Sequence, residues 1–133
     1  MNYITLVFDI KKSRELVNRS EVQNILIESL KKCNEEFKDI IASPFLIIIG
    51  DEWQGLLKEG SDYNKIINFF KNSLPSNIEF YTGIGIGYIT IHNFELTVNQ
   101  LDGPSFHLAR NAINYAKKKN YSIVLFACAH MSK

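Results

Sequence analysis

Residues 45–57 read Phe-Leu-Ile-Ile-Ile-Gly-Asp-Glu-Trp-Gln-Gly-Leu-Leu, and this stretch decides the fold. The continuous apolar run that ends at Gly50 predicts a central strand covered on both faces. Gly50-Asp51 is a turn signal, and residues 52–57 return as the second strand of a hairpin. The stretch therefore predicts a sheet with an acidic hairpin turn at one end.

The segment that precedes this hairpin predicts a strand followed by a helix. Residues 3–10 are β-branched and aromatic, which is typical of a buried strand, and Asp9 lies near its end. Residues 11–19 are charged and predict a loop or short helix. Ser20-Glu21-Val22-Gln23 has the form of a capping box, and apolar side chains at helical spacing then predict a helix to about Asp39.

The segment that follows the hairpin predicts two more helices and two more strands. Ser61 can cap a helix, and residues 78–91 read as a long strand. Asp102-Gly103-Pro104 announces a third helix with proline in its first turn. Three lysines, 117–119, stand at its C-terminal end, where the helix dipole favours cations. Residues 121–127 predict a closing strand.

The order of these elements predicts an α/β (α+β) fold. The first six form the ferredoxin-like βαββαβ arrangement of a palm domain, here with an additional C-terminal helix and strand. In this topology the end of the first strand lies beside the hairpin turn. We therefore expect Asp9 and Asp51 to converge at one end of the sheet.

Composition bounds the class of protein. The chain has 133 residues, 46% of them apolar and 22% charged, which predicts one folded domain over 1–133. A net charge of +1 gives no overall attraction to nucleic acid or to an anionic membrane. No apolar run is long enough to span a bilayer, and no signal peptide is evident, so we expect a cytoplasmic protein. Both cysteines, Cys33 and Cys128, are expected to be reduced thiols.

Carboxylates at the expected sheet end predict a metal site. Asp9, Asp51 and the neighbouring Glu52 supply the oxygen ligands that Mg²⁺ or Mn²⁺ prefers. Two such ions can activate a hydroxyl and neutralise a leaving pyrophosphate. The alternative is that both aspartates are ordinary turn residues, because Asp is common at such positions.

Three further features suggest contact with a ligand, and each has a structural alternative. The glycines at 83, 85 and 87 allow close approach of either a ligand or a facing helix. Arg110 could reach a phosphate from the third helix, or it could be a solvated residue while Asp102 or Ser105 caps that helix. The basic residues Lys11, Lys12, Arg14 and Arg19 suit a triphosphate but are equally typical of a solvated loop.

Four segments together resemble the SatD family of bacterial proteins. They are residues 8–14, residues 50–57 (Gly-Asp-Glu-Trp-Gln-Gly-Leu-Leu), residues 83–87 and residues 102–113, which begin Asp-Gly-Pro-Ser-Phe-His-Leu-Ala-Arg. The resemblance covers nearly the whole chain, but this family name implies little chemistry.

The same segments are similar, more distantly, to class III nucleotidyl cyclases and related palm-domain synthases. That resemblance implies that Asp9 and Asp51 bind two Mg²⁺ ions, with Glu52 as a third candidate, and that Arg110 supports the transition state. Phe106 stands where the family has asparagine, which argues against the usual cyclase route, and no GGDEF motif is present to indicate diguanylate synthesis. The remaining nucleotide-binding residues implied by position are Ile10, Lys11, Lys12, Ser13, Arg14, Gly50, Asp102 and Gly103.

The leading hypothesis is a Mg²⁺-dependent enzyme of nucleotidyl-transfer or cyclase type that acts on a nucleoside triphosphate. In it, backbone N–H groups of residues 11–13 hold phosphates together with Lys12 or Arg14. The class III resemblance also implies a homodimer. One rival is a palm domain that senses a nucleotide or nucleic acid without turnover, which Phe106 favours. A third hypothesis is a structural domain whose carboxylates are only turn residues.

Overall fold

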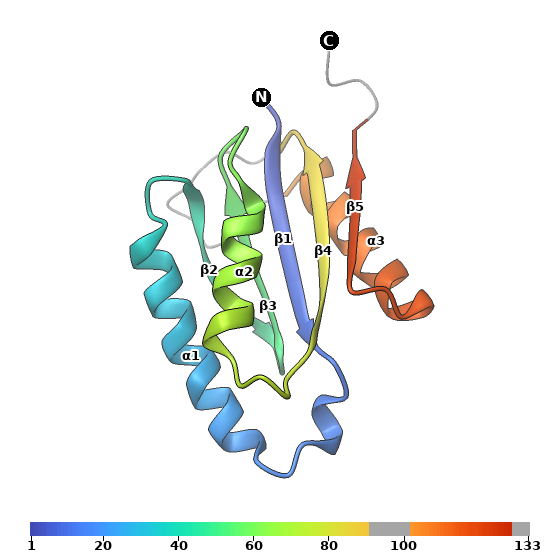
Figure 1. Ribbon diagram of the computed structural model, residues 1–133. Coiled ribbons are helices and arrows are strands. Elements are labelled where there is room, and N and C mark those ends of the chain that lie inside the picture. The colour runs from blue at the N-terminus through green and yellow to red at the C-terminus, as the bar shows by residue number, and fades with distance from the viewer. Residues whose placement is uncertain (91–101, 129–133) are drawn as a thin grey trace.

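The computed structural model describes residues 1–90 and 102–128, which form one five-stranded sheet with helices on both faces (Figure 1). The described elements are β1 Tyr3–Ile10, the short 3-10 helix η1 Ser13–Glu15, α1 Arg19–Glu36, β2 Ile41–Ile49, β3 Glu52–Leu57, α2 Tyr63–Ser73, β4 Phe80–Gly87, α3 Pro104–Lys119 and β5 Ile123–Ala127. This order confirms the predicted βαββαβ arrangement with an additional helix and strand.

β1 is the middle strand of a sheet with the order β2-β3-β1-β4-β5. It pairs antiparallel with both β3 and β4, while β5 lies parallel to β4. Because side chains alternate across a strand, β1 sends Leu6, Phe8 and Ile10 to one face and Thr5, Val7 and Asp9 to the other.

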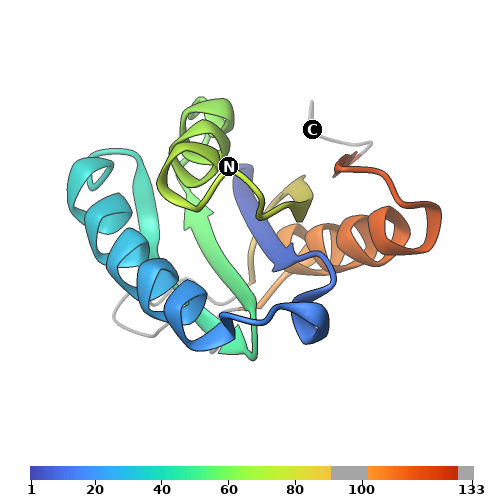
Figure 2. The same ribbon diagram turned by 60° about the horizontal axis from the view of Figure 1, so that its bottom comes forward.

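α1 and α2 cover one face of the sheet (Figures 1 and 2). An aromatic core lies between these helices and the sheet. Phe8 lies at its centre, with its ring stacked on Trp53 at a centroid distance of 5.1 Å and 5.2 Å from that of Phe70. Trp53 is fully buried, so it packs in this core and is not available to stack on a base. Cys33 lies in the same core, and burial raises the pKa of its thiol to about 12.

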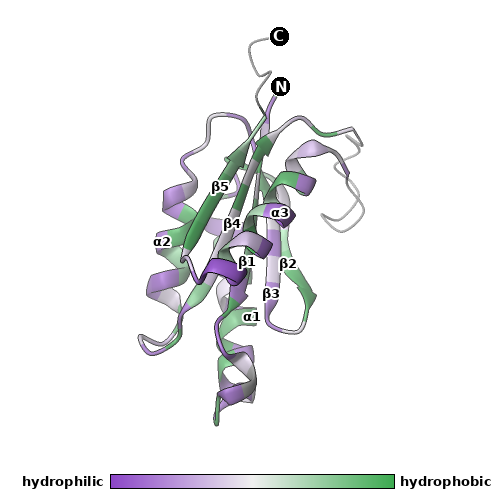
Figure 3. Cartoon of the chain, turned by 90° about the vertical axis from the view of Figure 1, so that its right-hand side faces the viewer, coloured by the Kyte–Doolittle hydropathy of each residue, from purple (hydrophilic) through white to green (hydrophobic). Residues whose placement is uncertain are grey.

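α3 covers the other face, opposite α2 (Figure 3), and packs directly on the glycines of β4. A Cβ atom on Gly85 would lie 2.3 Å from the backbone N of Ala109, and one on Gly83 would lie 2.6 Å from that of Ile113. Ser105 fixes the start of α3, because its Oγ donates to the carbonyl oxygen of Gly85 at 3.0 Å. Of the two predicted reasons for this glycine run, the structure therefore shows the facing helix.

The prediction that residues 45–50 form a central strand is wrong, because β2 is an edge strand. Its pairing with β3 is irregular, with register shifts along the strand. Phe45 is buried in the aromatic core, whereas Ile49 is 72% exposed beside the hairpin turn. A continuous apolar run therefore did not distinguish a central strand from an edge strand whose two faces pack unequally.

Several expected boundaries also differ from the structure. The capping box at Ser20 does not form, since α1 already begins at Arg19 and no side-chain cap is present at Asn18. Asp62, not Ser61, caps α2 by accepting from the N–H of Asn64. The predicted strand over 78–91 is shorter, because β4 ends at Gly87, and residue 91 lies outside the described residues.

Among residues 1–90 and 102–128, no helix combines the length and apolar character needed to cross a bilayer.

Candidate functional site

The end of β1 and the β2–β3 turn bring three carboxylates to one end of the sheet. Asp9 and Glu52 are directly opposite each other in the β1–β3 register. Asp51 occupies the turn itself, where Gly50 adopts a φ of +53° that favours glycine. The carbonyl oxygen of Asp51 accepts from the N–H of Ile10, at 3.3 Å, which ties the turn to β1. The topology therefore brings Asp9 and Asp51 to the same end of the sheet, as expected.

Each of these carboxylates is paired with a basic side chain from a helix. Arg19, at the start of α1, lies 3.2 Å from Asp51 Oδ2. From α3, Arg110 forms an ion pair with Glu52. Lys117, further along the same helix, lies 2.5 Å from Asp9 and 3.8 Å from Glu52. Three acidic and three basic side chains, from two helices, two strands and the β2–β3 turn, thus form one charged cluster.

Burial makes this cluster electrostatically sensitive. The side chains of Asp51 and Glu52 are 3% and 9% exposed, whereas their arginine partners are about half and more than one-third exposed. Burial raises the pKa of Asp9, and the neighbouring Glu52 and Asp51 charges act in the same direction, while Lys117 opposes the shift. The carboxylates therefore sit in a low-dielectric position that favours a cation beside them.

The predicted phosphate-binding loop directly follows β1 and so lies near this cluster. One of its backbone N–H groups, however, is already hydrogen-bonded within the protein. The N–H of Lys11 donates to the carbonyl oxygen of Glu79 at 2.8 Å, so it is not free to hold a phosphate as expected. The side chain of Ile10 is buried in the aromatic core. Lys12 and Ser13 stand at the start of η1, where N–H groups have no acceptor within the helix. The side chain of Arg14 lies outside what the structure describes.

Asp102 and Gly103, which the sequence predicts to bind nucleotide, lie outside this cluster. They lie at the start of α3, where Ser105 contacts Thr5 and the carbonyl oxygen of Tyr3 near the beginning of β1. Asp9 is at the other end of β1, roughly 20 Å away for a strand of this length. Asp102 instead accepts from the N–H of Gly103 at 2.8 Å, as a local turn residue.

Sequence reasoning missed the role of Lys117, which it assigned to the helix dipole. Arg110 and Lys117 are seven residues apart, which places them on the same helix face two turns from each other. That spacing could have indicated that both reach the same acidic end of the sheet. Arg19 was noted only as part of a basic loop, and nothing in its spacing shows that it reaches Asp51.

The donor set fits a hard divalent cation by chemistry, since carboxylate oxygens are the ligands that Mg²⁺ takes. The cluster is nevertheless arranged around basic side chains. Within residues 1–90 and 102–128, no three His, Cys, Asp or Glu side chains are grouped as a metal-binding set. A cation at Asp9 would have to take the place of the Lys117 ammonium, which lies 2.5 Å from that carboxylate.

Solved structures that are similar to this chain include nucleotide cyclase and GGDEF domains. A bacterial light-regulated adenylyl cyclase matches with a TM-score of 0.61 and 13% identity, over 93% of this chain and 74% of that one. The GGDEF domain of a Pseudomonas aeruginosa protein matches with a TM-score of 0.58 and 15% identity, over 93% and 81% of the two chains. The catalytic core of a rhodopsin-guanylyl cyclase matches with a TM-score of 0.55 and 13% identity, over 85% and 71%. The chain therefore has a nucleotide cyclase-like palm fold.

The family is more specific than the fold. The SatD family matches residues 3–131, which is nearly the full length, and the chain belongs to that family. A comparison with curated proteins finds no match.

Proposed function

We propose that this protein is a Mg²⁺-dependent enzyme of nucleotidyl-transfer or cyclase type that acts on a nucleoside triphosphate. The observation that carries the proposal is the charged cluster, in which Asp9, Asp51 and Glu52 meet Arg19, Arg110 and Lys117 at the end of β1. The fold supports it, because the neighbours include a cyclase core described in complex with ATPαS and a GGDEF domain described with cyclic di-GMP.

The sequence of the turn adds support. Residues 49–53 read Ile-Gly-Asp-Glu-Trp, which shares its Gly-Asp-Glu with the five letters that name the GGDEF domain and also ends in an aromatic residue. The full motif is absent, so the proposal does not extend to a cyclic dinucleotide product.

The charge balance of the cluster suits a metal–triphosphate complex. Three carboxylates and three basic side chains neutralise each other when no ligand is bound. A divalent cation would pair with the carboxylates and the phosphates would pair with the released basic groups, so both sets of charges exchange partners. When bound there, such a cation polarises a phosphoryl oxygen and lowers the pKa of an attacking hydroxyl.

The residues of this chain have distinct roles in the proposal. Asp9 and Asp51 would hold metal, with Glu52 as a third ligand. Arg110 would bind the transferring phosphoryl group, because a guanidinium presents fixed donors that match phosphate oxygens. The backbone N–H groups of Lys12 and Ser13, at the start of η1, would hold a further phosphate.

The test is thermal unfolding with Mg²⁺ or Mn²⁺ across a panel of nucleoside triphosphates. A ligand that binds only the folded state adds about 2.7 kcal/mol of stability at a hundredfold excess over its Kd. We expect a metal-dependent stabilisation with at least one nucleotide, and its loss in Asp9→Asn/Asp51→Asn. Asp39→Asn, at an exposed position before β2, is the matched control and should respond as wild type. No stabilisation of wild type by any nucleotide would contradict the proposal.

A second candidate function is nucleotide sensing without turnover, and Phe106 favours it. This side chain stands where class III cyclases have asparagine, and it packs on the apolar cluster of Tyr3, Leu56 and Ile89. An apolar, packed side chain there cannot supply the hydrogen bonds of an amide. Metal-dependent stabilisation by a nucleotide that is recovered unchanged after prolonged incubation would select sensing over catalysis.

A further inference from the structure

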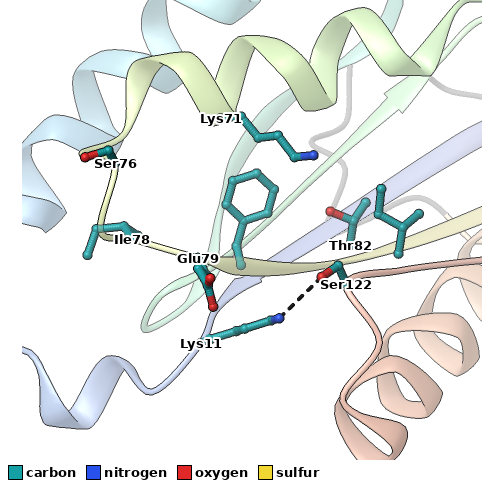
Figure 4. A pocket seen from close by; sticks show the side chains of 9 residues that line it. Lys11, Lys71, Ser76, Ile78, Glu79, Thr82 and Ser122 are labelled. Carbon is teal, nitrogen blue, oxygen red and sulfur yellow. Dashed lines mark hydrogen bonds between the residues drawn. The ribbon is translucent and has the colours of Figure 1, made fainter.

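A separate cavity lies between the C-terminal end of α2 and the first residues of β4 and β5. Its volume is about 310 Å³, within the range of small-molecule sites. Figure 4 shows the side chains that line it, which come from the C-terminal part of α2, the connection that follows, and the segments at β4 and β5. The residues that line it are Lys11, Lys71, Ser76, Ile78, Glu79, Phe80, Thr82, Ser122 and Ile123. The carboxylates of the charged cluster are not among them.

Two lysines reach this cavity from different elements. Lys71 extends from α2 and Lys11 from the segment after β1, so that both line the cavity (Figure 4). The Lys11 ammonium lies 3.4 Å from Ser122 Oγ and over the ring of Tyr81, at 4.9 Å from its centroid. The predicted phosphate-binding lysine therefore carries its charge into this cavity, while its backbone N–H is bonded to Glu79.

A buried hydroxyl in the cavity wall has no partner. Thr82 is 1% exposed, and its Oγ1 makes no hydrogen bond within the described part of the chain. Buried polar atoms are nearly always paired, so an unpaired hydroxyl in the wall of a cavity indicates a place for a ligand oxygen. Figure 4 shows Thr82 on the same side of β4 as Lys71.

The rest of the lining includes three apolar side chains and one carboxylate. Ile78, Phe80 and Ile123 provide apolar surface. Glu79 lowers the formal charge of the ionisable side chains in the lining from +2 to +1, so apolar contact must add to the attraction of the two lysines for an anion. A ligand that joins one phosphate to an apolar group satisfies both parts of this lining.

We propose that this cavity binds a small organic phosphate monoester. Its phosphate would lie between Lys11 and Lys71, with Thr82 and Ser122 as hydroxyl donors, and its apolar group would lie on Ile78 and Phe80. The two ammonium groups come from separate elements, so each can pair with a different oxygen of a phosphate, which carries a charge of nearly −2 in a monoester at neutral pH. This site does not depend on metal or on the charged cluster.

The experiment is a titration of the ¹⁵N-labelled protein with phenyl phosphate, followed by amide chemical shifts without divalent metal. We expect saturable shifts at residues 71–82 and 122–123. Phenol lacks the phosphate group and inorganic phosphate lacks the aromatic ring, so each should bind at least tenfold more weakly than phenyl phosphate. Benzoate, which replaces the phosphate by a single negative charge, should also bind more weakly.

Variants make the test specific. Lys71→Gln and the nearly isosteric Thr82→Val should each weaken binding at least fivefold, whereas Lys65→Gln, an exposed lysine on the same helix outside the cavity, should not. Asp51→Asn should bind phenyl phosphate as wild type does, which separates this site from the proposed metal site. Absence of saturable shifts, equal binding by Lys71→Gln, or shifts centred on Asp9 and Asp51 would each overturn the proposal.

Discussion

The face of the sheet that α1 and α2 cover is filled with large aromatic rings, whereas the face that α3 covers is lined with glycine and small residues. On the first face, Phe8 contacts the rings of Trp53, Phe70 and Phe80. On the second, α3 approaches so closely that its backbone touches the positions where side chains of Gly83 and Gly85 would begin.

This difference shows that one face mainly stabilises the fold, while the other mainly sets the position of α3. Aromatic burial supplies stability, because large apolar side chains remove the most surface from water. Close helix packing contributes less apolar area but fixes the height of α3 above the sheet. That height decides whether Arg110 and Lys117 reach Glu52 and Asp9. The second face therefore positions the charged cluster while the first holds the fold together.

The largest expected effect comes from breaking the aromatic face. Phe8→Ala should lower the free energy of unfolding by about 3–5 kcal/mol, because it removes the central ring of the core and leaves a cavity. Urea denaturation measures the change. Tyr88→Ala, at a side chain that is 49% exposed, is the control and should change it by less than about 0.5 kcal/mol. Similar costs for the two variants would contradict the assignment of stability to this core.

A smaller effect is expected from lifting α3 off the sheet. Gly85→Ala should cost about 2–3 kcal/mol, because its methyl group would meet the backbone of Ala109 and Ser105. Gly87→Ala is the comparison variant and should cost less, since the two atoms nearest to its Cβ, Leu108 Cδ1 and the backbone N of Ser105, are each 3.3 Å away. If Gly85→Ala has the stability of wild type, and its thermal unfolding responds to metal and nucleotide as that of wild type does, α3 does not need this close approach.

The ion pair between α3 and β3 gives a test within the charged cluster. Arg110→Ala should cost about 1–3 kcal/mol, because the buried carboxylate of Glu52 loses its guanidinium partner and keeps only Lys117, at 3.8 Å. Glu52→Gln in the same chain should recover part of the loss, which denaturant unfolding of the two single variants and the double variant would show. Purely additive costs would mean that the pair does not hold α3 at its position.

The smallest expected effect is a pH dependence at Asp9. Burial raises its pKa above the usual 3.8, so the ionised form destabilises the folded state and the protonated form does not. The stability of wild type relative to Asp9→Asn should therefore increase as the pH falls from 7 through the folded-state pKa. Unfolding free energies of both proteins at pH 7 and pH 4 would measure it. A difference that stays constant, or moves the other way, would show that Lys117 outweighs burial.

Much of the fold could be predicted from local patterns. The strand over 3–10, the hairpin turn at Gly50-Asp51 and the proline at the start of α3 each carry signals that depend only on nearby residues. The position of β2 could not be predicted in this way, because an apolar run does not record which neighbours a strand acquires. Asp62 replaced Ser61 as the cap of α2, because adjacent polar residues compete for that position and only the backbone conformation selects one.

The same distinction between local patterns and tertiary packing applies to the candidate site. The available chemistry follows from the sequence, since carboxylates stand at the ends of apolar strands and a βαββαβ order brings Asp9 and Asp51 to one end of the sheet. Which basic side chains join them depends on tertiary packing. Lys117 and Arg19 reach the carboxylates. Lys11 instead lines the cavity at the end of α2, and Asp102 lies near the opposite end of β1 from Asp9. The physical reason is that these contacts depend on the height and direction of α1 and α3 against the sheet, which packing across the whole molecule sets.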